Sequence, residues 1–145
     1  MKKTVLISSL LIMFIGTAVA QTQQETEKWL EDRLKQCFQS DTRTRLESLS
    51  VRDCKITIQT ITTFQNGNSQ TTSVGPINGL YFEGSSGTFL LYNRERVVLI
   101  KEESRGRTRT ETMNRFDERF NIPSDLLPRF QNALKHLQSF CKEPF

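Results

Sequence analysis

The sequence contains a single histidine, His136, and this scarcity limits the catalytic sites that it can build. A Ser-His-Asp or Cys-His site would have to use this residue. His136 falls on the flank of an amphipathic helical pattern, which is more typical of a boundary residue than of a catalyst. No Gly-x-Ser-x-Gly motif is present, and Gly84-Ser-Ser-Gly87 is typical of a turn between strands. A small hydrolase that uses His136 is therefore the least favoured function.

Metal and cofactor motifs are also missing. The three cysteines are far apart, with no Cys-x-x-Cys pair, whereas a structural zinc site normally needs about four nitrogen or sulfur ligands. No phosphate-binding loop or Gly-x-Gly-x-x-Gly run occurs. The acidic pairs Glu102-Glu103 and Asp117-Glu118 lie in charged, turn-like surroundings, and we interpret them as solvated carboxylates. We predict no catalytic residue, no metal ligand and no cofactor.

Long hydrophobic runs are confined to residues 1–20. This segment has two lysines, an apolar stretch and an Ala18-Val-Ala20 ending, which together predict a secretory signal peptide cleaved between Ala20 and Gln21. Its apolar stretch is shorter than the roughly 20 residues of a membrane span, so no transmembrane segment is expected after cleavage. Removing the two lysines lowers the formal net charge of +4 by two, which argues against nucleic acid as a partner. We predict a periplasmic or secreted protein.

The remaining residues, 21–145, fit one globular domain. In an oxidising compartment, three cysteines allow one disulfide and one leftover thiol. Cys141 ends the apolar stripe of the last helical segment, and Cys54 opens a strong strand pattern on its inward side. We favour a Cys54–Cys141 bond, with Cys37 free. The alternative is three buried thiols.

The first half of the domain shows a helical period followed by a period of two. Thr22 and Glu25 have the spacing of a capping box, which begins a helix over residues 23–38. Residues 39–45 are a polar connection, although residues 43–49 could add a helical turn. A strand extends from Cys54 to Phe64, and Asn66-Gly67 predicts a hairpin. The returning strand, residues 70–74, is polar enough to belong on a sheet edge.

The second half predicts more strands and a closing helix. Residues 88–92 and 96–101 are apolar strands joined by a turn at 93–95, and residues 108–116 return as another strand. The last helix begins after Pro123 with Asp125 as its cap. The predicted fold is α+β: an N-terminal helix, an antiparallel meander of five or six strands, and a C-terminal amphipathic helix packed on the sheet.

One surface feature carries a binding hypothesis. Arg105, Arg107 and Arg109 are spaced by two, so a strand would place their guanidinium groups on one face, where they could bind an anion. The competing interpretation, which we favour, is that the three arginines keep a hairpin rim soluble.

The order of these motifs, with Cys54-Lys-Ile-Thr-Ile58 and Ala133-Leu-Lys-His-Leu-Gln-Ser-Phe-Cys141, resembles small uncharacterised secreted proteins of Bacteroidetes-type bacteria. The meander with a C-terminal helix is similar to pleckstrin-homology-like, partly open barrels. This resemblance implies a fold and no activity. We therefore expect a non-enzymatic binding module for a protein or envelope component. The alternative is an inhibitor of, or accessory to, a secreted enzyme, presenting a loop such as residues 75–87.

Overall fold

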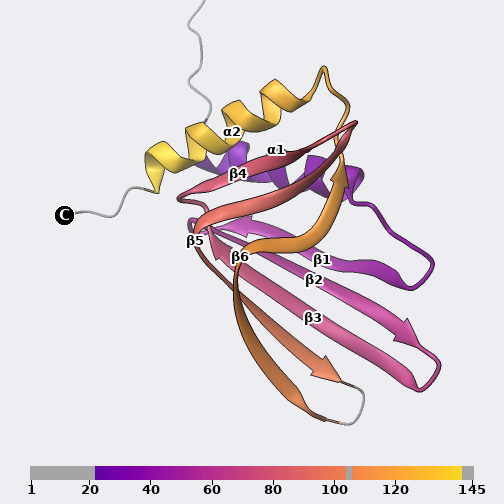
Figure 1. Cartoon of the computed structure of the whole chain (residues 1–145). Helices are drawn as coiled ribbons and strands as arrows, with labels where there is room; N and C mark the ends of the chain where they lie inside the picture. Colours follow the sequence, from indigo (N-terminus) through magenta and orange to yellow (C-terminus); the bar gives the residue numbers. More distant parts are fainter. Residues whose placement is uncertain (1–21, 104–105, 142–145) are drawn as a thin grey trace, which may run out of the picture.

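Two helices and six strands make up the part of the chain that the computed structural model describes, residues 22–103 and 106–141 (Figure 1). The predicted signal peptide lies outside these residues. In chain order the elements are α1 (Gln23–Cys37), β1 (Thr44–Arg52), β2 (Lys55–Phe64), β3 (Gly67–Pro76), β4 (Leu80–Ser85), β5 (Thr88–Glu103), β6 (Thr108–Asn121) and α2 (Leu127–Phe140). The predicted α+β class is confirmed: along the chain, one helix precedes the strands of an antiparallel sheet and another helix follows them.

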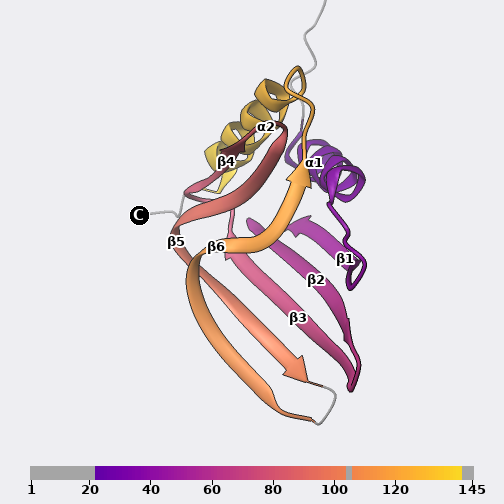
Figure 2. The same ribbon diagram turned by 45° about the vertical axis from the view of Figure 1, so that its right-hand side comes forward.

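The sheet curls into a half-barrel because β5 and β6 bend. β1, β2, β3 and β5 are consecutive neighbours, and β5 changes partner along its length: residues 88–93 pair with β4 and residues 98–103 with β3. β6 follows β5 through two register shifts and curves across the concave side (Figure 2). The seam between β1 and β6 is bridged just after α1, where the Gln39 amide donates to the Arg119 carbonyl at 2.9 Å.

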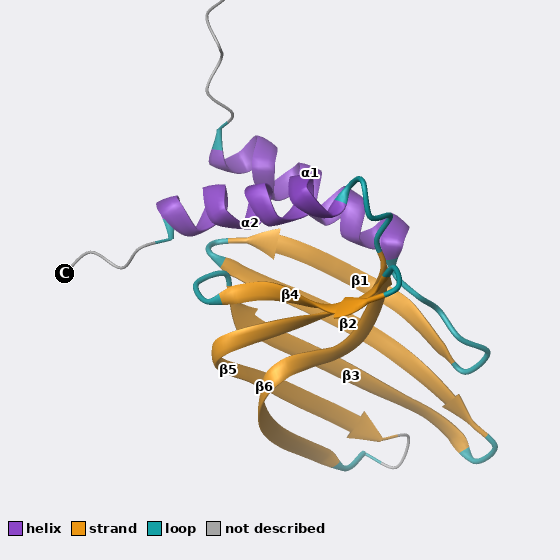
Figure 3. Cartoon of the chain, turned by 45° about the horizontal axis from the view of Figure 1, so that its top comes forward, coloured by secondary structure: helices purple, strands orange, loops and turns teal. Residues whose placement is uncertain are grey.

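Helix α1 begins as the sequence predicts. The Glu25 amide donates to the Thr22 hydroxyl at 3.2 Å, and the Thr22 amide donates to the Glu25 carboxylate at 2.8 Å, so the capping box is confirmed. Two leucines of α1, Leu30 and Leu34, are fully buried. They direct the helix onto one end of the sheet, beside α2 (Figure 3).

Strand β1 corrects the expectation of a connection or helical turn after residue 39. A register shift between Leu46 and Ser48 inserts one extra residue. The bulge brings Leu46 and Leu49 to the same side although they are three positions apart, a spacing that resembles a helix more than a strand. Because of the bulge, the spacing of apolar residues in β1 does not indicate a strand.

Two further predictions about strands are wrong. The polar strand expected on an edge is β3, which lies between β2 and β5 in the middle of the sheet. The turn expected at residues 93–95 does not exist, because β5 continues through it. Asn93, which suggested a turn, is buried, and its side-chain amide donates to the Pro76 carbonyl at 2.7 Å.

The last helix packs against α1 and β4, and a disulfide ties its end to the sheet. Phe130 of α2 contacts the rings of Trp29 and Phe82. Cys141 is bonded to Cys54 in the turn between β1 and β2, with 5.4 Å between the Cα atoms, so the predicted disulfide is confirmed. Cys37 is a free, half-buried cysteine, as predicted.

The predicted cap of α2 is wrong. The helix begins at Leu127 with Leu126 at the cap position and no side-chain hydrogen bond there. The amides of Leu126 and Leu127 donate to the Pro123 carbonyl at 2.9 and 3.2 Å. A backbone turn therefore satisfies the Leu127 amide, which an Asp125 cap was expected to bind.

Candidate functional site

An open cleft of about 560 Å³ lies on the concave side of the sheet, and no residue of α2 lines it. Residues from β1, β2, β3, β5, β6 and the connection after α1 line it: Phe38, Gln39, Asp41, Thr44, Thr60, Thr62, Phe64, Ser69, Thr71, Lys101, Asp117, Glu118 and Arg119. Most of these side chains are polar, and five carry a hydroxyl group. The cleft is therefore suited to a hydrogen-bonding ligand more than to a purely apolar one.

The cleft is the polar continuation of the hydrophobic core along the same strands. We define the covered half of the concave face as the buried residues under the helices, namely Leu49, Val51, Ile56, Ile58, Val97 and Leu99. The open half consists of the residues that continue the same strand faces into the cleft, namely Thr44, Thr60, Thr62, Ser69, Thr71 and Lys101. β1, β2 and β5 thus change from aliphatic to polar side chains at about the same level, whereas β3 has small or polar residues along this whole face.

Glu118 lies at the boundary between these halves. On β6 it alternates with Phe116 and Phe120, which are fully buried, and only 7% of Glu118 is exposed. Because β6 curves over the concave side, the Ser73 hydroxyl on β3 can donate to Glu118 Oε1, at 3.0 Å. Glu118 Oε2 is buried and has no hydrogen-bond partner among the described residues. This oxygen is therefore a buried hydrogen-bond acceptor without a donor, at the inner end of the cleft.

Burial raises the pKa of the Glu118 carboxyl, because a charge is poorly solvated there. Nearby backbone amides and the Ser73 hydroxyl lower it less, and the Asp117 carboxylate raises it further. Neither protonation state satisfies Oε2: a neutral carboxyl that donates its proton to Ser73 leaves Oε2 as an acceptor without a donor, and an ionised carboxyl leaves a charge there without a donor. A group entering the cleft would meet either need.

Three of the other four charged groups that line the cleft have partners, and the fourth, Arg119, is exposed. Lys101 Nζ lies 3.4 Å from Glu111 Oε2 on β6. Asp41 accepts hydrogen bonds from the amides of Arg43 and Thr44, which lower the pKa of its carboxyl. Asp117 lies at the rim, 3.7 Å from the Arg115 guanidinium. Glu118 is thus the buried charge-bearing group that lacks a full set of partners.

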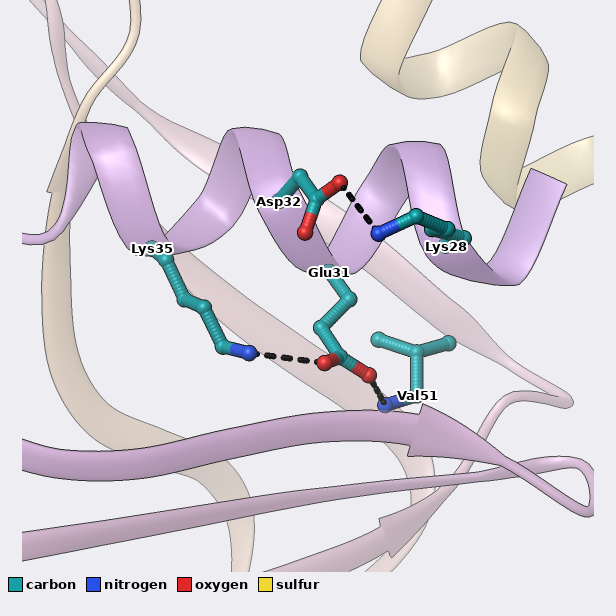
Figure 4. A network of polar contacts seen from close by, with 5 residues as sticks. All are labelled: Lys28, Glu31, Asp32, Lys35 and Val51. Atoms are coloured by element: carbon teal, nitrogen blue, oxygen red, sulfur yellow. Dashed lines mark hydrogen bonds and ion pairs between the residues drawn. The ribbon is translucent and has the colours of Figure 1, made fainter. Parts of the chain in front are cut away.

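A polar contact anchors α1 to the helix-covered end of β1 (Figure 4). Glu31 accepts from Lys35 Nζ at 2.7 Å and from the Val51 amide at 3.1 Å. Partial burial raises the pKa of Glu31, but these hydrogen bonds outweigh it, so the net shift is downward. The Glu31 carboxylate therefore accepts a hydrogen bond from a backbone amide that edge strand β1 does not pair with β2. This amide lies at the helix-covered end of the strand.

The arginine row predicted as an anion site lies partly outside the described residues. Arg105 belongs to the segment that is not described, and Arg107 is exposed just before β6 begins. Arg109 lies in β6, and its Nε is 2.9 Å from Glu111, which neutralises it locally. The binding hypothesis for this row stays a prediction.

His136 sits between the two helices. Its Nδ1 is 2.9 Å from the Thr26 hydroxyl, and its ring meets Phe140 edge-on with the ring centroids 4.9 Å apart. Within the described ranges, no carboxylate hydrogen-bonds or ion-pairs with it. The half-buried histidine occupies the boundary position that the sequence predicts.

Segment 75–87 is not the exposed loop that the inhibitor alternative requires. It contains the end of β3 and all of β4, and it buries Ile77, Leu80 and Phe82. Its connecting residue Asn78 donates a hydrogen bond to the Cys141 carbonyl. Only the short turn around Ser86 and Gly87 presents the chain to solvent as a loop, as Gly84-Ser-Ser-Gly87 predicts.

Cys37 offers no reactive site, since burial raises the pKa of its thiol and disfavours the nucleophilic thiolate. Across the described ranges, no group of three or more His, Cys, Asp or Glu residues is placed to hold a metal ion.

Sequence reasoning missed the cleft and its central acid, although two signals point to them. Asp117-Glu118 was interpreted as a solvated pair, but Phe116, Phe120 and Ile122 show the period of a strand, with Glu118 in register. The polar run from Ser69 to Ser73 was the second signal. An acid in an apolar register and a hydroxyl-rich strand between apolar ones together predict a polar site inside the sheet.

Comparison with known protein families, with curated proteins and with solved structures gave no match for the chain. Neither helix in the described part of the chain has the length and apolar character needed to cross a bilayer.

Proposed function

We propose that this protein is a non-enzymatic binding module, periplasmic or secreted, whose open cleft takes a small polar ligand. The observation that carries the proposal is Glu118, a carboxyl placed among buried phenylalanines with one oxygen unpartnered at the end of a hydroxyl-lined cleft. A carboxyl in such a position costs stability, and ionisable groups with strongly perturbed surroundings in a cleft are typical of functional sites.

The rest of the cleft supports recognition more than catalysis. The Ser73 hydroxyl donates to the Glu118 carboxyl, but Ser73 is fully buried, so its oxygen is not open to the reacting atom of a substrate. Thr60, Thr62 and Thr71 offer hydroxyl groups that can both donate and accept hydrogen bonds. Phe38 and Phe64 add apolar surface at the ends of the cleft. This mixture is typical of a pocket that orients a polar molecule.

The disulfide supports the proposed compartment. Disulfides persist in oxidising environments such as the periplasm or the extracellular space. The Cys54–Cys141 bond therefore agrees with the signal peptide predicted over residues 1–20. An envelope component or a small molecule in that compartment would be the natural ligand.

The experiment is a titration of ¹⁵N-labelled protein with a panel of small hydroxylated and amino compounds, read from amide chemical shifts. We expect shifts that cluster on the residues of the cleft. Thr71→Val should weaken binding severalfold, because Thr71 lines the cleft. Its neighbour Thr72 points to the convex face, so Thr72→Val is the matched control and should bind as the parent does. Shifts scattered over the surface, or equal effects of both variants, would contradict the proposal.

A further inference from the structure

The chemical class of the ligand follows from the partners that Glu118 has and lacks. Resting on the proposed function, we propose that the ligand carries a protonated amine, which donates to Glu118 Oε2 at the inner end of the cleft. The carboxyl then makes hydrogen bonds through both oxygens, one to the Ser73 hydroxyl and one to the ligand. Such a charge-assisted hydrogen bond is about twice as strong as one between neutral groups.

A neutral hydroxyl could also reach Glu118, but the surrounding charges favour a cation. Asp117 is the residue before Glu118, and its carboxylate makes the site more negative. Asp41, which also lines the cleft, accepts hydrogen bonds from two backbone amides, and these favour its ionised form. Two cations line the cleft: Lys101 is already close to Glu111, and Arg119 is exposed. The three carboxylates of Asp41, Asp117 and Glu118 outnumber these two cations, so a positive ligand meets net negative charge.

The walls also suit the carbon skeleton of an amine. The Phe38 ring packs edge-on against Phe120, with their centroids 6.1 Å apart, so Phe38 is fixed by the core on one side and borders the cleft on the other. Aromatic faces attract ammonium groups and pack against methylene groups. The hydroxyls of Thr60 and Thr62 lie in the same cleft and can bind further polar groups of the ligand.

Glu118 Oε2 itself has almost no exposed surface, although the residue lines the cleft. The ammonium must therefore insert between the small side chains above the carboxyl. A primary amine is the smallest cationic group that fits this description, whereas a quaternary ammonium has no proton to donate. The proposal consequently predicts selectivity for primary over quaternary amines.

The test uses 4-aminobutan-1-ol and butane-1,4-diol, which have equal numbers of heavy atoms and differ by one ammonium for one hydroxyl. Dissociation constants come from amide chemical shifts of the cleft at pH 7. We expect the amino alcohol to bind about tenfold or more tightly than the diol. Replacing its amine with a trimethylammonium group should remove most of this advantage.

Two variants test whether Glu118 causes the preference for the amino alcohol over the diol. Glu118→Gln keeps the shape of the side chain and should lower the preference for the amino alcohol over the diol to about onefold. Glu83→Gln, on an exposed residue of β4 outside the cleft, is the control for the change in net charge and should keep the preference. If Glu118→Gln does not fold, Glu111→Gln serves instead: it releases Lys101, whose freed charge should weaken amino alcohol binding severalfold without altering Glu118.

The outcomes separate this inference from the function on which it rests. Equal binding of both compounds in the cleft would overturn the amine assignment and leave a polar-ligand module. Persistence of the preference in Glu118→Gln would also overturn it, because Asp41 or Asp117 would then be the anchor. No binding of either compound, together with no cleft-centred shifts from the wider panel, would overturn both.

Discussion

The covered and open halves of the concave face share strands but differ in chemistry. β2 passes from Ile56 and Ile58 under the helices to Thr60 and Thr62 in the cleft. In the covered half, Phe116 packs so closely to Gly75 that a Cβ atom there would lie 2.9 Å from its ring. In the open half only Thr60 is buried, and the other five residues are half-buried. The covered half is therefore a core because other elements, among them β6 through Phe116, pack onto it, whereas the open half borders the cleft.

The largest expected effect is loss of the covalent tie in the covered half. In a Cys37→Ala background, Cys54→Ala with Cys141→Ala should lower the free energy of unfolding by about 4–5 kcal/mol, because the bond closes a separation of 87 residues. Urea unfolding measures the change. Cys37→Ala alone is the control and should retain the disulfide. A loss below about 1 kcal/mol would mean that the covered half does not depend on this constraint.

A matched pair of phenylalanines compares the two halves directly. Phe116→Ala should cost about 3–5 kcal/mol, because it leaves a cavity among buried side chains. Phe64, at the mouth of the cleft, is 53% exposed, so Phe64→Ala should cost less than about 1 kcal/mol. Thermal or urea unfolding of both variants gives the two values. Similar losses would show that the open half contributes to the core as much as the covered half does.

The smallest expected effect is the pH dependence of stability contributed by Glu118, which lies at the boundary between the two halves. The pKa of Glu118 is raised above its ordinary value of 4.5 in the folded protein. The folded state therefore keeps its proton to higher pH than the unfolded state, and this contribution to stability falls as pH rises from about 4.5 through the raised pKa. Glu118→Gln should remove that fall.

Unfolding by urea across pH 4 to 8, with Glu83→Gln as the matched control, measures the difference between the two profiles. The parent and Glu83→Gln should share the downward slope, and Glu118→Gln should be flatter. Parallel profiles for all three proteins would mean that Glu118 ionises as freely in the folded state as in the unfolded chain.

Local chemistry made much of the fold predictable. The capping box at Thr22 and Glu25 and the hairpin at Asn66-Gly67 each depend on residues within a few positions. The disulfide was also predictable. Cys54 begins the apolar face of a strand pattern and Cys141 ends the apolar stripe of a helix, so both side chains were expected to face the core. Such features need no knowledge of how distant elements assemble.

The cleft was not predictable in the same way. Whether Thr60 and Thr71 face a core, a partner or solvent depends on where α1 and α2 end over the sheet, which no local pattern encodes. Glu118 required knowing that β6 continues beyond residue 116 and curves inward. The bulge at Leu46 and Ser48 likewise hid β1, and with it one wall of the site.

The free thiol of Cys37 gives the disulfide a competitor during folding. Cys37 is much closer in sequence to Cys54 than Cys141 is, so an unfolded chain in an oxidising environment would meet the Cys37–Cys54 pair first, because short loops close more readily. The native bond can form only once α2 reaches the turn after β1. Correct oxidation is therefore a late event, and a shuffling catalyst or a Cys37→Ala substitution would raise the yield of native protein.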